Sequence, residues 1–236
     1  MYTGIVKLIL YGYQTGFIPQ STDENKPPKV VITKPVENAR LQWNSIVPYS
    51  IYVNDPEDGN SEYDEISSRE VLLMVNYLPD PTTANKYLNQ GIDKIPEPLI
   101  QMGKSTCFNC HASKDKMFGP SFELIATRYG DNPSEIEALM ENVTSGSTGT
   151  WGELKMPPHP DLDNEQLRKI ISWILENGAN PNKTFYVGTE GIFRTIEKPA
   201  GKAGVYVLTA SYSDHGMNDM PTTNRQGNHT VVLKPF

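Results

Sequence analysis

The 236-residue chain contains only two cysteines, Cys107 and Cys110, so once this pair is used together no thiol remains for a disulfide framework or a four-thiolate cluster. Acidic residues outnumber basic ones by 28 to 21, and the formal net charge of −7 argues against nucleic acid as a partner. The first twenty residues lack a basic start and an A-x-A cleavage site, and their apolar part, residues 2–13, is too short to span a bilayer. This stretch therefore gives no evident targeting signal or membrane anchor.

The two cysteines belong to the motif Cys107-Phe-Asn-Cys110-His111. This C-x-x-C-H spacing is typical of covalent haem c attachment, in which each thiol adds to one haem vinyl group and the histidine binds the iron. The thiols could also form a redox dithiol or half of a zinc site. A redox dithiol is expected within a βαβ pattern, which is missing around this motif, and the remaining histidines are poorly placed for zinc. The motif therefore favours one covalent haem c.

A haem iron in an electron carrier usually has a second protein ligand, and methionine is the natural partner of histidine. Met156 lies in an irregular stretch before a helical pattern and is followed by two prolines, which stiffen the loop by fixing φ and removing backbone donors. We therefore predict Met156 as the second ligand. His159 is the alternative, because haems with two histidine ligands exist and it follows only three residues later.

Helical patterns surround the two candidate ligands. We predict helices over residues 98–105, 121–129, 134–143 and 163–178. The third is expected to begin with a capping box formed by Ser134 and Glu137, and the fourth with a cap formed by Asp163 and Gln166. Between the first two helices, the rigid Gly119-Pro120 turn can present a carbonyl to the ring N–H of the histidine ligand and orient it.

Residues from about 88 to 180 resemble a class I cytochrome c of the small bacterial kind with a single haem. The matching segments, in the order typical of that family, are 104–111, 118–122, 146–152, 155–158 and 171–175. The resemblance implies that Cys107 and Cys110 carry the thioether bonds and that His111 and Met156 are the axial ligands.

The same resemblance assigns supporting roles around the haem. It implies that the carbonyl of Pro120 accepts a hydrogen bond from the iron-binding histidine and that the indole N–H of Trp151 donates to a haem propionate. An iron held by two side chains has no free position for oxygen, peroxide or a substrate, so we expect an electron carrier and not an enzyme. Haem-based catalysis or sensing is the alternative and would require Met156 to leave the iron. Because covalent haem attachment occurs outside the cytoplasm, we expect an exported protein, periplasmic or extracellular.

The composition on either side of this region changes to short apolar or alternating runs separated by Gly, Pro and Asn turns, which is typical of β-strands. These runs are residues 29–33, 46–53, 71–77, 184–187, 191–196, 204–212 and 229–234. The runs before the haem region resemble a small immunoglobulin-like or PKD-like sandwich.

We therefore predict a multidomain fold, with an all-α class I cytochrome c domain flanked by all-β, sandwich-like segments. The expected parts are an N-terminal strand or leader (1–26), an immunoglobulin/PKD-like β-sandwich (27–82), the cytochrome c domain (86–181) and a C-terminal β segment (184–236).

The β regions also suggest partners. Residues 3–12 resemble the closing strand of a β-propeller in quinoprotein-like sugar dehydrogenases that continue into a PKD-like module and a cytochrome. This implies that the chain is the electron-exporting tail or subunit of a secreted dehydrogenase and passes electrons to a terminal oxidase or another cytochrome. The alternative is self-assembly, in which unpaired terminal strands pair with neighbouring chains and stack the haems into a conduit.

An acidic run between two of the predicted strands offers oxygen ligands for calcium, in particular Asp55, Glu57 and Asp58. The run lacks the regular Asp spacing of an EF-hand loop. A solvated acidic turn is the simpler interpretation, and calcium binding is the alternative to it.

Overall fold

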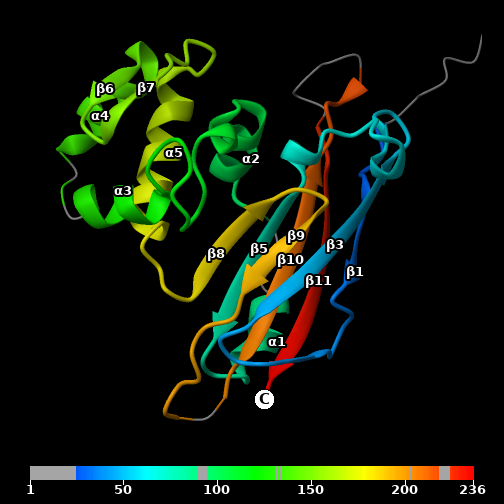
Figure 1. Ribbon diagram of the computed structural model, residues 1–236. Coiled ribbons are helices and arrows are strands. Elements are labelled where there is room, and N and C mark those ends of the chain that lie inside the picture. Colours follow the sequence, from blue (N-terminus) through cyan, green and yellow to red (C-terminus); the bar gives the residue numbers. More distant parts are fainter. Residues whose placement is uncertain (1–24, 90–94, 131, 133, 202, 218–223) are drawn as a thin grey trace, which may run out of the picture.

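The computed structural model describes residues 25–89, 95–130, 132, 134–201, 203–217 and 224–236. The predicted N-terminal strand or leader, residues 1–26, lies outside these ranges except for its last two residues. Figure 1 shows a group of helices beside a set of long strands. None of the helices in the described ranges is long and apolar enough to cross a membrane.

Strands from distant parts of the chain form a first, antiparallel sheet around a central strand, β3. Its members are β1 (Lys29–Lys34), β3 (Ile46–Asp55), β4 (Gly59–Asn60) and β9 (Glu190–Arg194). Along β3 buried residues alternate with more exposed ones, as expected for a strand with one face on the core. Buried partners face each other across the pairs, for example Val30 opposite Val53 and Val47 opposite Phe193.

A second sheet has the strand order β2-β11-β10-β5-β8. Its members are β2 (Arg40–Leu41), β5 (Leu72–Leu78), β8 (Lys183–Val187), β10 (Val205–Ser213) and β11 (Gln226–Pro235). β2 runs parallel to β11, and the other neighbours are antiparallel. Because β5 and β8 are adjacent in this sheet, the helical region between them in sequence is an insertion into the sandwich.

The helical region contains five helices and one hairpin within the described residues. The helices are α1 (Thr83–Asn89), α2 (Glu97–Lys104), α3 (Phe122–Tyr129), α4 (Glu135–Ser145) and α5 (Asn164–Asn177). The hairpin pairs β6 (Ser147–Gly149) with β7 (Gly152–Met156). Short 3₁₀ turns are η1 (Ser61–Tyr63), η2 (Ser68–Glu70) and η3 (Cys107–Asn109). Figure 1 shows α2 to α5 and the hairpin as one group, with α1 near the opposite end of β5.

β5 is buried on both faces and therefore belongs to two hydrophobic cores. Leu73 and Val75 pack between the two sheets, in a core that also contains Tyr206 of β10. Leu72 and Met74 point the other way and join the core formed by the helices. β5 therefore contributes side chains from one face to the core between the two sheets and from the other face to the core of the helical region.

The helix ends test the predicted capping boxes. The cap of α5 is confirmed, since Gln166 N–H donates to Asp163 Oδ1 at 2.8 Å and the side chain of Gln166 accepts from Asp163 N–H at 3.0 Å. The capping box predicted for α4 is wrong. Ser134 makes no side-chain cap there and its hydroxyl instead lies 2.6 Å from Oδ1 of Asn132, because an Asx turn precedes the helix.

The predicted fold class is wrong in two respects. About 33% of the chain is strand and 28% helix, and the helical region includes the β6–β7 hairpin, so it is not all-α. The β regions are also not separate flanking segments, since β5 pairs with both β8 and β10. The hairpin is short, rich in glycine and mostly exposed, so its sequence lacks the apolar alternation of a strand. β10 is buried along its length, and its pairing with β11 on one edge and β5 on the other gives its buried backbone groups hydrogen-bond partners.

Candidate haem site

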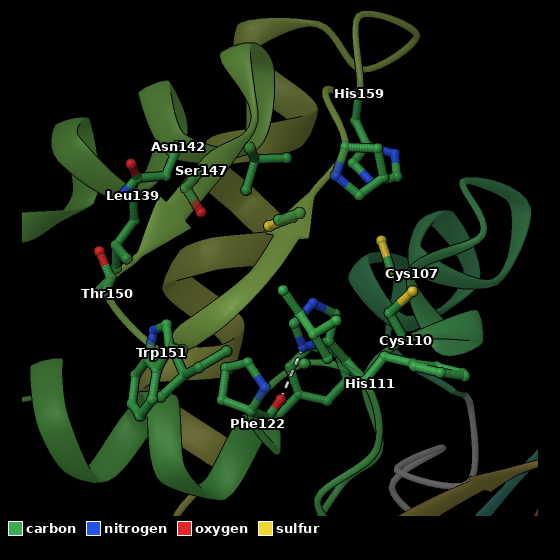
Figure 2. A pocket seen from close by; sticks show the side chains of 18 of the residues that line it. Cys107, Cys110, His111, Phe122, Leu139, Asn142, Ser147, Thr150, Trp151 and His159 are labelled. Carbon is green, nitrogen blue, oxygen red and sulfur yellow. Dashed lines mark hydrogen bonds between the residues drawn. The ribbon is translucent and has the colours of Figure 1, made fainter.

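The helices and the hairpin surround a cavity of about 610 Å³. Its apolar walls come from α3, α4 and α5, and they include Ile125, Leu139, Val143, Leu167, Ile171 and Ile174. Every residue predicted for haem binding also lines it: Cys107, Cys110, His111, Pro120, Trp151 and Met156. Figure 2 shows the two thiols and the histidine along one side of the cavity and Trp151 on the other. The structure therefore brings together residues that are spread over 50 positions of the sequence.

The two thiols are held by a tight turn. Cys107 begins η3, preceded by Thr106 in the left-handed conformation with φ of 62°. The N–H groups of Cys110 and His111 both donate to the carbonyl of Cys107, at 3.2 and 3.1 Å. Burial raises the pKa of the Cys107 thiol to about 11, so this sulfur is protonated at neutral pH. A catalytic redox dithiol needs a thiolate of lowered pKa, and this environment does the opposite.

The imidazole of His111 is buried, with 9% of the residue exposed. Its Nδ1 lies 2.7 Å from the carbonyl oxygen of Pro120, which can only accept, so Nδ1 carries the proton. Nε2 is then the unprotonated nitrogen, the form that binds a metal. Burial lowers the pKa of His111, more than the bond to Pro120 raises it, which keeps the ring neutral. The ring also stacks on Phe122, with centroids 5.5 Å apart and planes at 30°.

Met156 is the last residue of β7, opposite Ser147 of β6, and not part of an irregular stretch as predicted. The backbone of Met156 packs closely against Gly146, since a Cβ on Gly146 would lie 2.7 Å from the carbonyl oxygen of Met156. His159 lines the same cavity, and its Nδ1 lies 3.9 Å from Asp161 Oδ1. Figure 2 shows His159 across the cavity from His111. Both candidates for the second ligand are thus brought to the same site.

Trp151 sits at the tip of the β6–β7 hairpin and is about one-third exposed. The guanidinium of Arg128 lies 4.8 Å from the centroid of its ring and donates to the carbonyl of Thr150 at 3.2 Å. Tyr129 makes an edge contact with the indole, at 6.2 Å between centroids. These contacts from α3 fix the hairpin tip at the rim of the cavity.

The donor set and the walls of the cavity fit a covalently bound haem. Two thiols, a neutral imidazole with a free Nε2 and a thioether line one apolar space, and all belong to ligand types that haem proteins use. Gly119 is part of the fit, because it leaves room for the imidazole: a Cβ there would lie 2.4 Å from Cε1 of His111. The sequence shows a Gly-Pro pair here, which indicates a tight turn but not the close approach of the imidazole.

The predicted calcium ligands lie elsewhere, at the end of β3 and in the loop after it. Oδ1 of Asp55 accepts from the N–H groups of Glu57 and Asp58, at 2.9 and 2.8 Å. Oδ2 of Asp58 accepts from the hydroxyl of Tyr212 at 2.7 Å and from the N–H of His215 at 3.0 Å. Within the described ranges, no group of three or more His, Cys, Asp or Glu side chains could hold a metal ion. The structure therefore gives no support for calcium, because the carboxylates brace the loop instead.

Gly119→Ala is expected to destabilise the site. The added methyl would overlap the imidazole of His111, and the backbone cannot move away easily because Gly119 N–H donates to the carbonyl of Cys110 at 2.8 Å. We expect a loss of about 1–3 kcal/mol in the free energy of unfolding of the haem-loaded protein, measured by denaturant titration. Gly201→Ala is the control, because its Cβ would meet nothing within 4 Å. Equal stability of the two variants would contradict this assignment.

Comparison with known proteins gives the family. No family model matches the chain. Over 72 residues it is 32% identical to cytochrome c-552 of Nitrosomonas europaea, covering 30% of this chain and 70% of that protein. Over 75 residues it is 35% identical to cytochrome c2 of Rubrivivax gelatinosus, covering 31% of this chain and 88% of that protein. The crystal structure of wild-type Nitrosomonas europaea cytochrome c552 aligns at 31% identity over 31% of this chain and 91% of that chain, with a TM-score of 0.31.

The site fits a bound haem, and the similar proteins named above are cytochromes c, which supports an electron-transfer haem protein. Through this region, about 30% of its length, the chain belongs to the class I monohaem cytochromes c. Covalent haem c follows from that membership, as does electron transfer to redox partners. The relatives are electron carriers, not enzymes, and they match only this part of the chain.

Proposed function

We propose that this protein is an exported electron-transfer cytochrome with one covalent haem, bound through Cys107 and Cys110 and ligated by His111 and Met156. When bound, the haem supplies an iron that takes up and releases one electron. The observation that carries the ligand assignment is the hydrogen bond between His111 Nδ1 and the carbonyl of Pro120, 2.7 Å long. That bond leaves Nε2 free to bind the iron and fixes the direction of Nδ1.

The side chains around the cavity support electron exchange in preference to bond chemistry. Leu167, Ile171 and Ile174 of α5 line the cavity and limit the access of water to it. Apolar surroundings keep the reorganisation energy of electron transfer small. At the rim, Phe118 and Leu154 line the cavity and are both more than two-thirds exposed. We propose that partners approach at this rim, where these two apolar side chains are accessible.

We propose that the donor is an extracytoplasmic dehydrogenase and that the acceptor is a terminal oxidase or another cytochrome. The support is architectural: the haem region, residues 86–181, is inserted in a β-sandwich between β5 and β8 and is not a free small cytochrome. A rigid β support is suited to holding a haem at a constant position beside a larger enzyme. We also propose export to the periplasm or the exterior, where haem is attached covalently, as for the homologous class I cytochromes c.

The proposal is tested by a redox titration of the wild-type protein, produced together with a haem-attachment system and followed by absorbance. We expect one reversible one-electron transition, a weak far-red band in the ferric form typical of methionine ligation, and no spectral change when carbon monoxide is added to the reduced form. Rapid carbon monoxide binding would contradict the electron-carrier assignment, because it requires an open iron position. Failure of the chain to acquire haem would contradict the whole proposal.

A further inference from the structure

Phe185 is a residue of the sandwich that lies within the core of the haem region. It sits in the middle of β8, opposite Met74 of β5, and is 5% exposed. Its ring packs against three other aromatic rings with centroid distances of 5.5 to 5.8 Å: Phe108, Phe122 and Trp173. Phe108 is one of the two residues between the cysteines of the motif. A β-strand outside the cytochrome-like region thus contacts the haem-attachment turn itself.

The contact continues from Phe185 to the histidine ligand through one ring. Phe122 lies 5.6 Å from Phe185 at an interplanar angle of 35°, and 5.5 Å from His111 at 30°. Phe122 therefore lies between the other two rings, stacked on His111 and tilted against Phe185.

A backbone hydrogen bond runs beside the stack. The N–H of Phe185 donates to Oγ of Ser113, at 3.4 Å, and Ser113 lies two residues after His111 and is buried. Ala112 lies between His111 and Ser113 in the sequence, and its carbonyl accepts from the N–H of Phe122 at 3.0 Å. β8 therefore contacts the segment that follows His111 through the backbone N–H of Phe185 as well as through the ring of Phe185.

These contacts restrain the one degree of freedom that the Pro120 bond leaves to the imidazole. A single hydrogen bond to Nδ1 fixes the tautomer and the direction of one nitrogen, but the ring can still rotate about that bond. A face contact with Phe122 opposes this rotation, and Phe122 itself is backed by Phe185. Because each ring rests on the next, a displacement of Phe185 is passed through Phe122 to His111.

We propose that Phe185 is a positioning residue for His111, so that the β-sandwich sets the orientation of the axial histidine and the reduction potential of the haem. This proposal rests on the proposed function, since it takes His111 as an iron ligand. Phe185 also excludes water from the histidine side of the haem region. Its removal admits polar surroundings, which favour the charged ferric form and lower the reduction potential.

The test compares Phe185→Leu with Phe193→Leu in the haem-loaded full chain. Phe193 is a matched control, because it is 1% exposed, lies in the core between the sheets and contacts the ring of Tyr206 but, among the described residues, no ring of the haem region. Two properties are measured: the reduction potential and the hyperfine-shifted haem methyl resonances of the ferric protein, whose pattern reports the orientation of the axial histidine. We expect Phe185→Leu to lower the potential and to change the spread of the methyl shifts, and Phe193→Leu to lower only the melting temperature.

Ser113→Ala provides a second variant if Phe185→Leu does not mature. It removes the acceptor of the Phe185 N–H without creating a large cavity, so the methyl shifts should change in the same sense by a smaller amount. Unchanged potential and methyl shifts in both variants, with haem attached as in the wild type, would overturn the positioning role while leaving the proposed function intact. A wild-type protein without haem would instead overturn the proposed function.

Discussion

Replacing both Cys107 and Cys110 by serine is expected to abolish covalent haem attachment completely. In the proposed attachment each thiol forms one thioether bond to the haem, and the chain has no other cysteine to replace them. The measurement is the mass of the denatured polypeptide after production with a haem-attachment system. Wild type should carry the added mass of one haem, and the double variant should have the mass of the polypeptide alone.

The same double variant should also lose the native packing of the helical region. A dry, apolar cavity of about 610 Å³ would cost on the order of 10 kcal/mol by the dependence found for small core cavities, as much as a whole domain's stability. The cavity walls would therefore collapse or admit water. Circular dichroism should show reduced helix content relative to wild type. Haem that remains bound to the double variant after denaturation would refute the attachment site.

Replacing Met156 by leucine is expected to open the sixth position of the iron. Leucine has nearly the volume of methionine but no sulfur, so the core packing is kept while the ligand is lost. The reduced variant should then bind carbon monoxide, and its reduction potential should fall by on the order of 0.1 V, a fraction of the roughly 0.8 V range that axial ligands span. Spectra with and without carbon monoxide, and a redox titration, measure both effects.

His159→Leu is the matched control for this prediction, because His159 lines the same cavity three residues later. If Met156 is the ligand, this variant should bind no carbon monoxide and keep the far-red band of the ferric form. The opposite outcome, with His159→Leu opening the iron and Met156→Leu leaving it closed, would identify a haem with two histidine ligands. The two variants together therefore decide between the two candidates that the sequence left open.

The cysteine–histidine motif was easier to recognise from the sequence than the fold, because its residues are close together in the chain. The spacing of Cys107, Cys110 and His111 predicted covalent haem c, and the similarity to class I cytochromes c supports it. The capping box of α5 could also be recognised from the sequence, since its two partners are three residues apart and mostly exposed. The predicted box of α4 was wrong because Asn132 provides a competing local acceptor for the same serine.

The β6–β7 hairpin shows why the all-α prediction was wrong. Hydrophobic periodicity detects a strand only when one of its faces is buried, and most residues from Ser147 to Met156 are exposed. The hairpin exists because Gly149 and Gly152 adopt positive φ angles of 91° and 124° and reverse the chain near Trp151. Glycine permits such angles, but its presence alone does not require them.

By itself, the sequence determined the haem-attachment turn, the rigid Gly-Pro segment after it and the existence of most helices and strands, because these depend on residues close together in the chain. Only the tertiary structure decided that β5 serves two cores and that Phe185 of β8 reaches the ring stack on His111. The physical reason is that an apolar residue in a strand indicates burial, but the sequence does not indicate which residues pack against it. Leu72 and Leu73 look equivalent in the sequence, and the pleat sends one toward the haem region and the other into the sandwich.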